Sequence, residues 1–265
     1  MRIATWNINS VRLRIESLKQ FSEAFSPDII CLQEIKVCDS DFPFEAIKAF
    51  GYPYIEVCGE KSYNGVAILS KLPLSQCIKL QFDGPKQARH IAATLADGTE
   101  IHNFYVPAGG DEPDVTINPK FAHKLAFMDS VTAWFAAKRN KQDRLIIVGD
   151  LNIAPLEHDV WSHKQLLNIV SHTPIEVAKM TTLQQSLDFI DVCRVHVPAS
   201  EKLYSWWSYR NRDWRSSNRG RRLDHIWVSP ALQEAILASD IIKDIRDWQQ
   251  PSDHVPVIAD FANIS

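Results

Sequence analysis

The chain has 265 residues, of which 45% are hydrophobic and 10% aromatic, and its formal net charge at pH 7 is -3. This composition excludes a disordered chain, and the slightly acidic balance means that any binding to nucleic acid must rest on a local basic surface. Five scattered cysteines without a C-x-x-C pair predict reduced thiols and no structural zinc. Because we find neither a leader peptide nor a run of 18 apolar residues, we expect a soluble cytoplasmic protein with no membrane partner.

The first part of the chain predicts a strand, a helix and a second strand. Residues 1–8 alternate apolar and polar side chains, and apolar residues at helical spacing follow. Ser10 is expected to cap this helix, and residues 28–34 are expected to form the second strand. A unit of this length pairs its strands in parallel through a right-handed crossover. That pairing would place Asn7 and Glu34 at the same edge of one sheet.

The rest of the chain repeats this rhythm of strands and helices. We expect strands at residues 63–70, 74–80, 90–95, 100–106, 145–150, 203–209, 223–229 and after 251. We expect helices at residues 43–50, 121–138 and from 230, an exposed loop at 108–119, and irregular helical structure at 156–190. Sheet-rich halves with helices outside favour a layered α/β (α+β) sandwich in a single domain over residues 1–265.

The strand at residues 145–148 consists of four aliphatic residues, which predicts burial on both faces. Asp150 and Asn152 follow it one residue apart, and in an extended chain this spacing sends both side chains to the same side. An acid there can take a proton from water, while an amide can orient the water or contact a phosphoryl oxygen. Taken alone, the more ordinary explanation is an Asx turn that caps a buried strand.

Polar groups that can bind a metal or move a proton recur at the ends of several predicted strands. They are Asn7, Glu34, Asp150 with Asn152, Asp224, and Asp253 with His254. A single charged side chain at a strand end is usually just solvated. Their repetition beside apolar strands is harder to explain in this way, because clustered carboxylates repel one another unless a cation is present.

Seven short motifs occur in order along the whole chain. They are Thr-Trp-Asn-Ile-Asn from Thr5, Leu-Gln-Glu-Ile-Lys from Leu32, Tyr-Asn-Gly-Val from Tyr63, Tyr-Val-Pro from Tyr105, Gly-Asp-Leu-Asn from Gly149, Arg-Leu-Asp-His from Arg222 and Ser-Asp-His-Val-Pro from Ser252. Together they resemble the motifs of the exodeoxyribonuclease III family, the bacterial apurinic/apyrimidinic endonuclease branch of the endonuclease/exonuclease/phosphatase superfamily.

The resemblance implies a DNase I-like fold, a four-layered sandwich of two mixed β-sheets flanked by helices. It also implies a DNA repair enzyme that hydrolyses phosphodiesters with Mg²⁺. Three activities are expected in open proportion: 3′–5′ exonuclease on duplex DNA, endonuclease at abasic sites and cleaning of blocked 3′ ends. The expected partner is double-stranded DNA, abasic or 3′-blocked, bound by a monomer.

Phosphodiester hydrolysis suits these residue types. An anionic diester resists attack, so cleavage needs a cation on its oxygens and an activated water in line with the leaving group. Glu34 is the first candidate metal ligand, with Asn7 and Asp253 nearby. Such oxygen ligands suit Mg²⁺, with Mn²⁺ as an alternative. One or two metal ions remain open at this point.

The remaining candidate residues are expected to act on the attacking water and on the phosphate. Asp150 would activate or hold the attacking water, and Asn152 would orient that water or the phosphate. His254 would bind a non-bridging oxygen, while Asp224 would fix its ring and favour its charged form. Tyr105 would hydrogen-bond the scissile phosphate or assist the leaving oxygen. The identity of the general base stays open.

A basic segment between residues 202 and 222 predicts the DNA contact. Seven basic residues (Lys202, Arg210, Arg212, Arg215, Arg219, Arg221 and Arg222) face one acid, Asp213, and accompany Trp206, Trp207 and Trp214. Basic and aromatic groups together suit phosphate contacts and stacking on exposed bases or an abasic gap. The alternative is a solvated loop held by cation–π contacts. The DNA-binding candidates are Lys36, Trp206, Arg210, Arg219, Arg221 and Leu223.

Two residues depart from the family pattern. Ala108 stands where the family commonly has an amide-bearing residue after Tyr-x-Pro. Arg221 stands where relatives place an aliphatic or aromatic residue around the abasic sugar, beside Trp206 and Leu223. We expect such a pocket to select less strongly for a base-free sugar.

Two other functions compete with this reading. The first is a branch of the superfamily that cleaves a phospholipid or inositol phosphate with the same metal core, but the arginine-rich segment favours DNA. The second is a scaffold that only binds nucleic acid. Such a scaffold would be expected to have lost Glu34, Asp150, Asp224 or His254, and all four are present.

Overall fold

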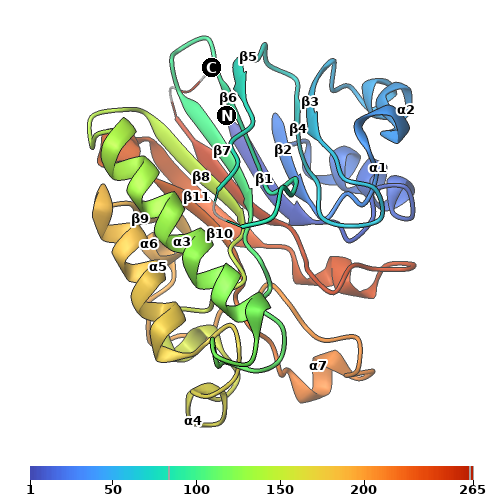
Figure 1. Ribbon diagram of the computed structural model, residues 1–265. Helices are drawn as coiled ribbons and strands as arrows, with labels where there is room; N and C mark the ends of the chain where they lie inside the picture. Colours follow the sequence, from blue (N-terminus) through green and yellow to red (C-terminus); the bar gives the residue numbers. More distant parts are fainter. Residues whose placement is uncertain (83, 263, 265) are drawn as a thin grey trace.

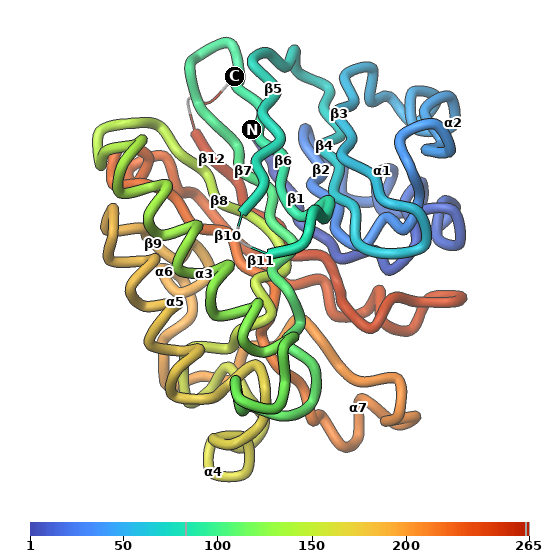
Figure 2. The backbone as a smooth tube through the Cα atoms, in the orientation of Figure 1, coloured from blue at the N-terminus to red at the C-terminus, as the bar shows by residue number. Residues whose placement is uncertain are grey.

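Two six-stranded sheets form the centre of the molecule in the computed structural model, which describes residues 1–82, 84–262 and 264 (Figure 1). The first sheet has the order β11 (Ile236–Ile241), β12 (Val257–Phe261), β1 (Arg2–Asn7), β2 (Ile29–Gln33), β4 (Val66–Ser70) and β3 (Tyr54–Cys58). The second has the order β5 (Ser75–Ile78), β6 (His90–Thr94), β7 (Glu100–Tyr105), β8 (Leu145–Asp150), β10 (Asp224–Val228) and β9 (Ile190–Asp191). Strands β1 and β12 are neighbours although they come from opposite ends of the sequence (Figure 2).

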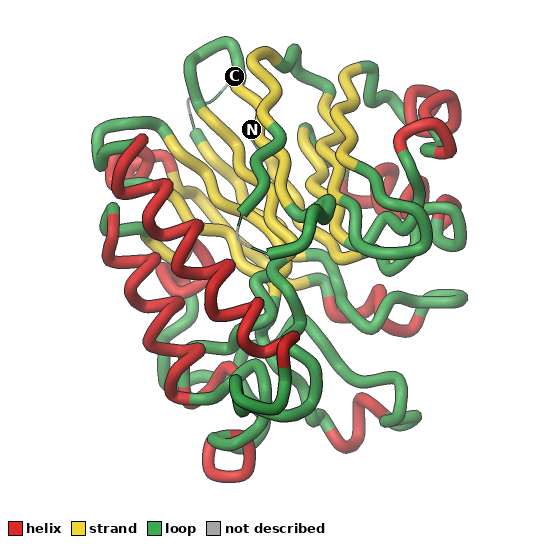
Figure 3. Tube along the Cα trace, in the orientation of Figure 1, coloured by secondary structure: helices red, strands yellow, loops and turns green. Residues whose placement is uncertain are grey.

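The helices lie outside the two sheets, which gives the predicted four layers (Figure 3). Helices α1 (Ile15–Phe25) and α2 (Phe44–Ala49) pack on the first sheet, and α3 (Pro119–Lys138) and α5 (Pro174–Ser186) pack on the second. Shorter helices are α4 (His163–Leu166), α6 (Val192–His196) and α7 (Trp214–Ser217), with 3₁₀ turns at Asp39–Asp41, Glu157–Asp159, Pro230–Ala235 and Lys243–Asp247. Among the described residues, none of the helices combines the length with the apolar composition of a membrane-spanning segment.

The apolar runs of the central strands follow from this layering. In β8, Ile146 and Val148 lie in the core between the sheets, whereas Leu145 and Ile147 pack against the layer of α3 and α5. Successive side chains of a strand point to opposite faces, so a strand covered on both faces must be apolar throughout.

The topology brings several strand ends to one end of the sandwich. Strands β1 and β2 pair in parallel, so Asn7 and Glu34 stand at the same edge, as predicted. Strands β7 and β8 also pair in parallel, and their last residues, Tyr105 and Asp150, are opposite each other. Strand β10 runs antiparallel to β8 and begins with Asp224 opposite Asp150. Five polar candidates are thus delivered to one place by rigid backbone.

Some local predictions are wrong. Helix α1 begins at Ile15, and Ser10 lies in the left-handed region (φ 87°), too far from the helix to cap it. The predicted strand at 203–209 is absent from the described structure, where Trp206 makes only isolated bridges to Arg221 and His254. The segment from residue 230 is a 3₁₀ turn that leads into β11. Strands β3 and β11 were not predicted, because both contain exposed positions and lack a continuous apolar run.

Candidate active site

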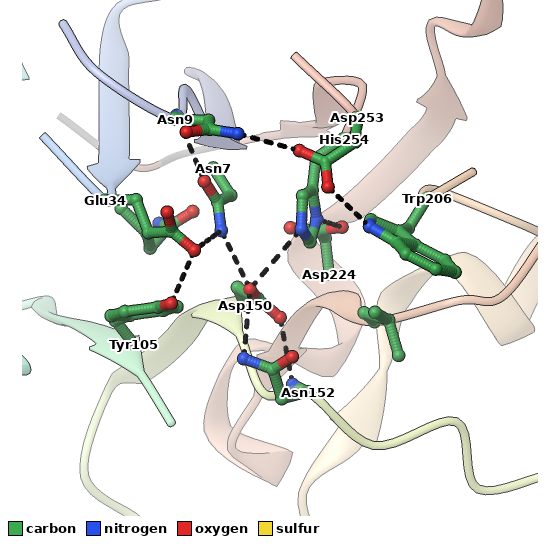
Figure 4. A network of polar contacts seen from close by, with 12 residues as sticks. Asn7, Asn9, Glu34, Tyr105, Asp150, Asn152, Trp206, Asp224, Asp253 and His254 are labelled. Atoms are coloured by element: carbon green, nitrogen blue, oxygen red, sulfur yellow. Dashed lines mark hydrogen bonds and ion pairs between the residues drawn. The ribbon is translucent and has the colours of Figure 1, made fainter. Parts of the chain in front are cut away.

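A cavity of about 240 Å³ opens where these strand ends meet. Six of the predicted catalytic and metal-binding residues line it: Glu34, Tyr105, Asp150, Asn152, Asp253 and His254. The other two, Asn7 and Asp224, are fully buried and hydrogen-bond to residues of the cavity wall (Figure 4). The structure therefore brings all eight side chains into one network.

Asn7 connects the acids of the two sheets. Its Nδ2 atom donates to Asp150 Oδ2 at 2.9 Å and to Glu34 Oε1 at 3.3 Å (Figure 4). Its Oδ1 atom accepts from the backbone N–H of Asn9 at 3.1 Å. Two carboxylates thus approach each other across a single amide, and their repulsion is relieved only in part.

Glu34 follows strand β2 in a left-handed conformation with φ 50°. Its carboxylate accepts from the hydroxyl of Tyr105 and forms an ion pair with Lys36 at 2.9 Å. Burial alone would raise the pKa of Glu34, but the bonds from Tyr105 and Lys36 outweigh burial and lower it, so the carboxylate is charged. Burial and the charge of Glu34 raise the pKa of Tyr105 well above its ordinary value, so Tyr105 remains a neutral donor.

His254 lies between two aspartates. Its Nδ1 atom is 2.8 Å from Asp224 Oδ2, and its Nε2 atom is 3.7 Å from Asp150 Oδ2. Burial would lower the pKa of His254, but the two carboxylates outweigh burial and raise it, which makes the ring an imidazolium. The pKa of Asp150 is raised, first by burial and then by Asp224, although the charge of His254 opposes the change. Ser205 Oγ donates a second bond to Asp224 Oδ2 at 2.6 Å.

Asn152 contacts Asp150 through a turn. Its backbone N–H donates to Asp150 Oδ1 at 2.9 Å, and its Nδ2 donates to Val106 O at 2.9 Å and to Asp150 Oδ2 at 3.2 Å. The expectation of an extended chain here is wrong, because Asn152 has a left-handed φ of 53°. The Asx-type turn is present, and the turn itself brings the side chains of Asp150 and Asn152 together.

Asp253 faces away from Glu34, toward Trp206. Its Oδ1 accepts from Asn9 Nδ2 at 3.1 Å and its Oδ2 accepts from Trp206 Nε1 at 2.9 Å. Lys36 donates to Asn9 Oδ1 at 2.6 Å, which joins this acid to the Glu34 side of the cavity. Asp253 thereby orients the indole ring at the cavity wall.

The donor set fits a hard divalent cation on the Glu34 side. Ligand-type atoms of Asp150, Asp224 and His254 lie within 4.8 Å of one another, but the imidazolium already supplies positive charge there and cannot ligate a metal. Glu34 and Asp150 instead approach the same amide of Asn7. The carboxylate oxygens of Glu34 and Asp150 suit Mg²⁺ or Mn²⁺, whereas Asn7 turns its Nδ2 toward both acids and its Oδ1 toward the Asn9 N–H.

Basic and aromatic residues surround the cavity on two sides. A hollow of about 370 Å³ adjoins it and is lined by Trp161, Trp206, Ser208, Arg210, Asn211, Ser217, Arg219 and Arg221. Arg219 stacks over Trp161 at 4.8 Å, and Arg221 stacks over Trp206 at 5.3 Å. A second hollow of about 520 Å³ shares Tyr105 and Ala108 with the cavity. The three hollows share lining residues, Trp206 and Arg221 on one side and Tyr105 and Ala108 on the other, and we refer to them together as the groove.

Part of the predicted basic segment has a structural role instead. Arg222 is fully buried and pairs with Asp159 at 2.7 Å, and Arg215 pairs with Asp244 and Asp247. Trp207 and Trp214 are also buried. Of the DNA-binding candidates, Arg210 and Arg219 are exposed, Trp206 and Arg221 are half-buried, Leu223 is buried in the cavity wall and Lys36 is bound to Glu34.

Sequence reasoning missed several residues that support the site. Asn9 connects Asn7, Lys36 and Asp253, and the Asn-x-Asn spacing could have revealed it because it repeats the Asp-x-Asn pattern. A fully buried ion pair between Lys124 and Glu176 was missed as well. Its partial signal was the Thr-Pro-x-Glu sequence, a capping box at the start of α5.

Known proteins that resemble this chain in sequence and fold are nucleases and related phosphate-ester hydrolases. The model of the Endonuclease/Exonuclease/phosphatase family matches residues 4–254. Exodeoxyribonuclease III of Haemophilus influenzae is 33% identical over 98% of this chain and 100% of that protein. An AP endonuclease structure from Archaeoglobus fulgidus superposes with a TM-score of 0.91 at 28% identity, with 100% of both chains covered. The 3′ phosphatase NExo from Neisseria, bound to a product DNA hairpin, gives 0.88 at 29% identity, with 99% of each chain covered.

The fold and the site define a hydrolase with a buried acid–histidine cluster at the end of a DNase I-like sandwich. More particularly, the chain belongs to the Endonuclease/Exonuclease/phosphatase family, and the resemblance to exodeoxyribonuclease III predicted from the seven motifs is confirmed. The four-layered fold and the expectation of a DNA-hydrolysing enzyme are confirmed with it.

Proposed function

We propose that the protein is a Mg²⁺-dependent DNA repair nuclease that hydrolyses phosphodiesters of duplex DNA. The observation that carries the proposal is the meeting of Glu34, Asp150 and the His254–Asp224 pair at the floor of a basic and aromatic groove. A groove with arginine and tryptophan walls suits the phosphates and exposed bases of DNA. The monomeric state, the single domain and the cytoplasmic location are parts of the same proposal.

Glu34 would hold the metal ion beside Asn7, whose Nδ2 donates to Glu34 and whose Oδ1 accepts from Asn9, and Asp253 would act through Asn9 on the far side. When bound, the ion would supply positive charge to the phosphate and its leaving oxygen. Tyr105 and Lys36 lower the pKa of Glu34 against the effect of burial and keep its carboxylate ionised. Tyr105 is protonated at neutral pH, so it donates a hydrogen bond to Glu34 or to a phosphate oxygen.

Asp150 is the proton acceptor in this proposal. Burial raises its pKa toward neutrality, and a base is most effective when its pKa is close to the working pH. Asn152 is fixed by Val106 O and by Asp150, so it orients the attacking water with its remaining oxygen. His254, charged and held by Asp224, binds a non-bridging oxygen as negative charge develops on it.

The wall of the cavity bears on substrate choice. Arg221 Nη1 donates to Val170 O at 3.0 Å and to Ser171 Oγ at 2.7 Å, while its guanidinium covers Trp206. It is therefore a fixed, charged wall where an extruded abasic sugar would have to fit. We infer that 3′-terminal groups are processed in preference to internal abasic sites.

The test is a duplex with one internal abasic analogue in a 5′-labelled strand, incubated with the protein and either Mg²⁺ or EDTA. The proposal expects Mg²⁺-dependent shortening from the 3′ end together with weaker internal nicking. A protein that leaves this duplex intact at every Mg²⁺ concentration would refute it, especially if the same preparation cleaves a phospholipid or inositol phosphate.

A further inference from the structure

A buried ion pair lies behind the active site, between the two helices that cover the second sheet. Lys124 of α3 and Glu176 of α5 are both fully buried, and Lys124 Nζ lies 2.5 Å from Glu176 Oε1. Taking two charges out of water is costly, and an apolar pair of similar volume often serves stability as well or better. Because burying these two charges costs stability, we expect the Lys124–Glu176 pair to have a role other than joining the two helices.

Lys124 reaches two loops of the active site. Its Nζ atom donates to Asn152 O at 2.8 Å and to Ala108 O at 3.3 Å. Asn152 is in the left-handed region (φ 53°), which asparagine adopts more readily than other non-glycine residues, and the bond from Lys124 fixes its carbonyl in that conformation. Gly109 has φ 91°, and a Cβ added there would come within 2.9 Å of the Lys124 side chain. The loop after β7 therefore packs tightly against the aliphatic part of the Lys124 side chain.

Glu176 holds a third loop. Its two carboxylate oxygens accept from the Ser171 N–H at 2.9 Å each, and one also accepts from the N–H and hydroxyl of Thr173 at 3.1 and 2.7 Å. Ser171 in turn accepts from Arg221 through its hydroxyl at 2.7 Å. The Glu176 carboxylate thereby fixes the Val170–Ser171 segment, to which the Arg221 side chain hydrogen-bonds.

We propose that Lys124 and Glu176 are positioning residues of the active site. Lys124 acts through Asn152 and Ala108, and Glu176 acts through Ser171 and Arg221; neither contacts the substrate. The inference rests on the proposed function for its catalytic readout. A single ion pair thus sets the water-orienting amide on one side of the cavity and the charged wall on the other.

The experiment separates positioning from stability with three variants. In Lys124→Met/Glu176→Leu an apolar pair replaces the ions, so the double variant should keep the fold even where Lys124→Met alone does not. In Lys124→Arg the charge is kept. The matched control is Lys179→Met. It removes an exposed ion pair between Lys179 and Asp129 (2.6 Å), which joins the same two helices.

Each variant is measured for its unfolding midpoint in urea, for kcat and KM on a 3′-ended duplex, and for hydrogen exchange at the amides of Asn152, Ser171 and Thr173. We expect the folded double variant to lose about tenfold or more in kcat, with KM changed far less, because misplaced reacting groups cost rate. Its exchange at the three amides should rise. Lys124→Arg should recover part of kcat, and Lys179→Met should match the wild type in kcat and in exchange.

Wild-type kcat and wild-type exchange in the folded double variant would overturn the inference. An equal loss in Lys179→Met would also overturn it, because the effect would then belong to helix packing. If the wild-type protein does not cleave DNA, the proposed function fails, and the exchange at Asn152 and Ser171 still decides whether the pair positions these loops.

Discussion

His254 and Asp224 form a buried pair in which Nδ1 of the ring lies 2.8 Å from Oδ2 of the carboxylate. On its other side the same ring is 3.7 Å from Asp150. The positive charge of His254 therefore interacts with the carboxylates of both Asp224 and Asp150, and the protonation of the three groups is linked. The arrangement keeps the ring charged while the base beside it has a pKa raised by burial.

Asp224→Asn should reduce kcat by about 10²-fold or more, because an amide no longer favours the imidazolium. The carboxylate raises the pKa of His254, so its removal lowers that pKa. Activity that needs the charged ring is lost as pH rises through this pKa. The alkaline limb of the kcat–pH profile should therefore move to lower pH in the variant, and an unmoved limb would mean that His254 does not act as a cation.

Glu34→Ala should abolish cleavage at ordinary Mg²⁺ concentrations with little loss of stability, since Glu34 follows the end of a strand. The measurement is the cleavage rate across a Mg²⁺ titration, beside the exposed control Glu45→Ala. Partial recovery at high Mg²⁺ would be expected of a lost ligand. Full turnover of Glu34→Ala at limiting Mg²⁺ would show that this carboxylate does not hold the ion.

Arg221→Leu should raise abasic incision relative to 3′ exonuclease activity, because an apolar wall accepts a base-free sugar more readily. It should also reduce the salt dependence of DNA binding by about one phosphate contact. Arg210→Leu, at an exposed position of the adjoining hollow, should reduce the salt dependence without changing the ratio. If the two rates change together in Arg221→Leu, specificity must be sought in the loops at residues 108–119 or 161–172.

Asp159→Asn should destabilise the fold by at most about 3–5 kcal/mol at pH 7, because it breaks the buried pair with Arg222 while Asp191 still pairs with that guanidinium at 2.7 Å. Burial would raise the pKa of Asp159, but Arg222 and Arg194 outweigh burial and lower it. A lowered pKa stabilises the fold above the ordinary pKa of aspartate, and this stabilisation is lost as pH falls through the pKa of the folded state. Urea unfolding at several pH values should show the variant approaching the wild type in acid; a constant difference would contradict this.

The parallel units around Asn7, Glu34 and Asp150 could be predicted from the sequence, because their strands are covered on both faces and appear as apolar runs with polar ends. The eight catalytic and metal candidates were found in this way and through the seven motifs. Edge strands β3 and β11 could not be found, since half-exposed positions remove that pattern.

Contacts between segments that are far apart in the chain could not be predicted from the sequence either. Arg222 sits within the basic segment, and only the tertiary structure turns its side chain inward to Asp159. Lys124 lies on a helix whose polar residues are otherwise expected to face solvent, and its burial depends on Glu176 more than 50 residues later in the chain. From the charge composition alone, a basic residue that forms a buried ion pair cannot be distinguished from one that contacts DNA.

The central claim is that Asp150 accepts the proton of the attacking water, and Asp150→Asn tests it most directly. The measurement pairs the single-turnover cleavage rate with the equilibrium affinity for the same 3′-ended duplex in Mg²⁺. Removal of a proton acceptor spares contacts of the ground state, so the account predicts a rate loss of about 10³-fold or more with affinity nearly unchanged. Equal losses of affinity and rate, or a variant that cleaves at the wild-type rate, would contradict it.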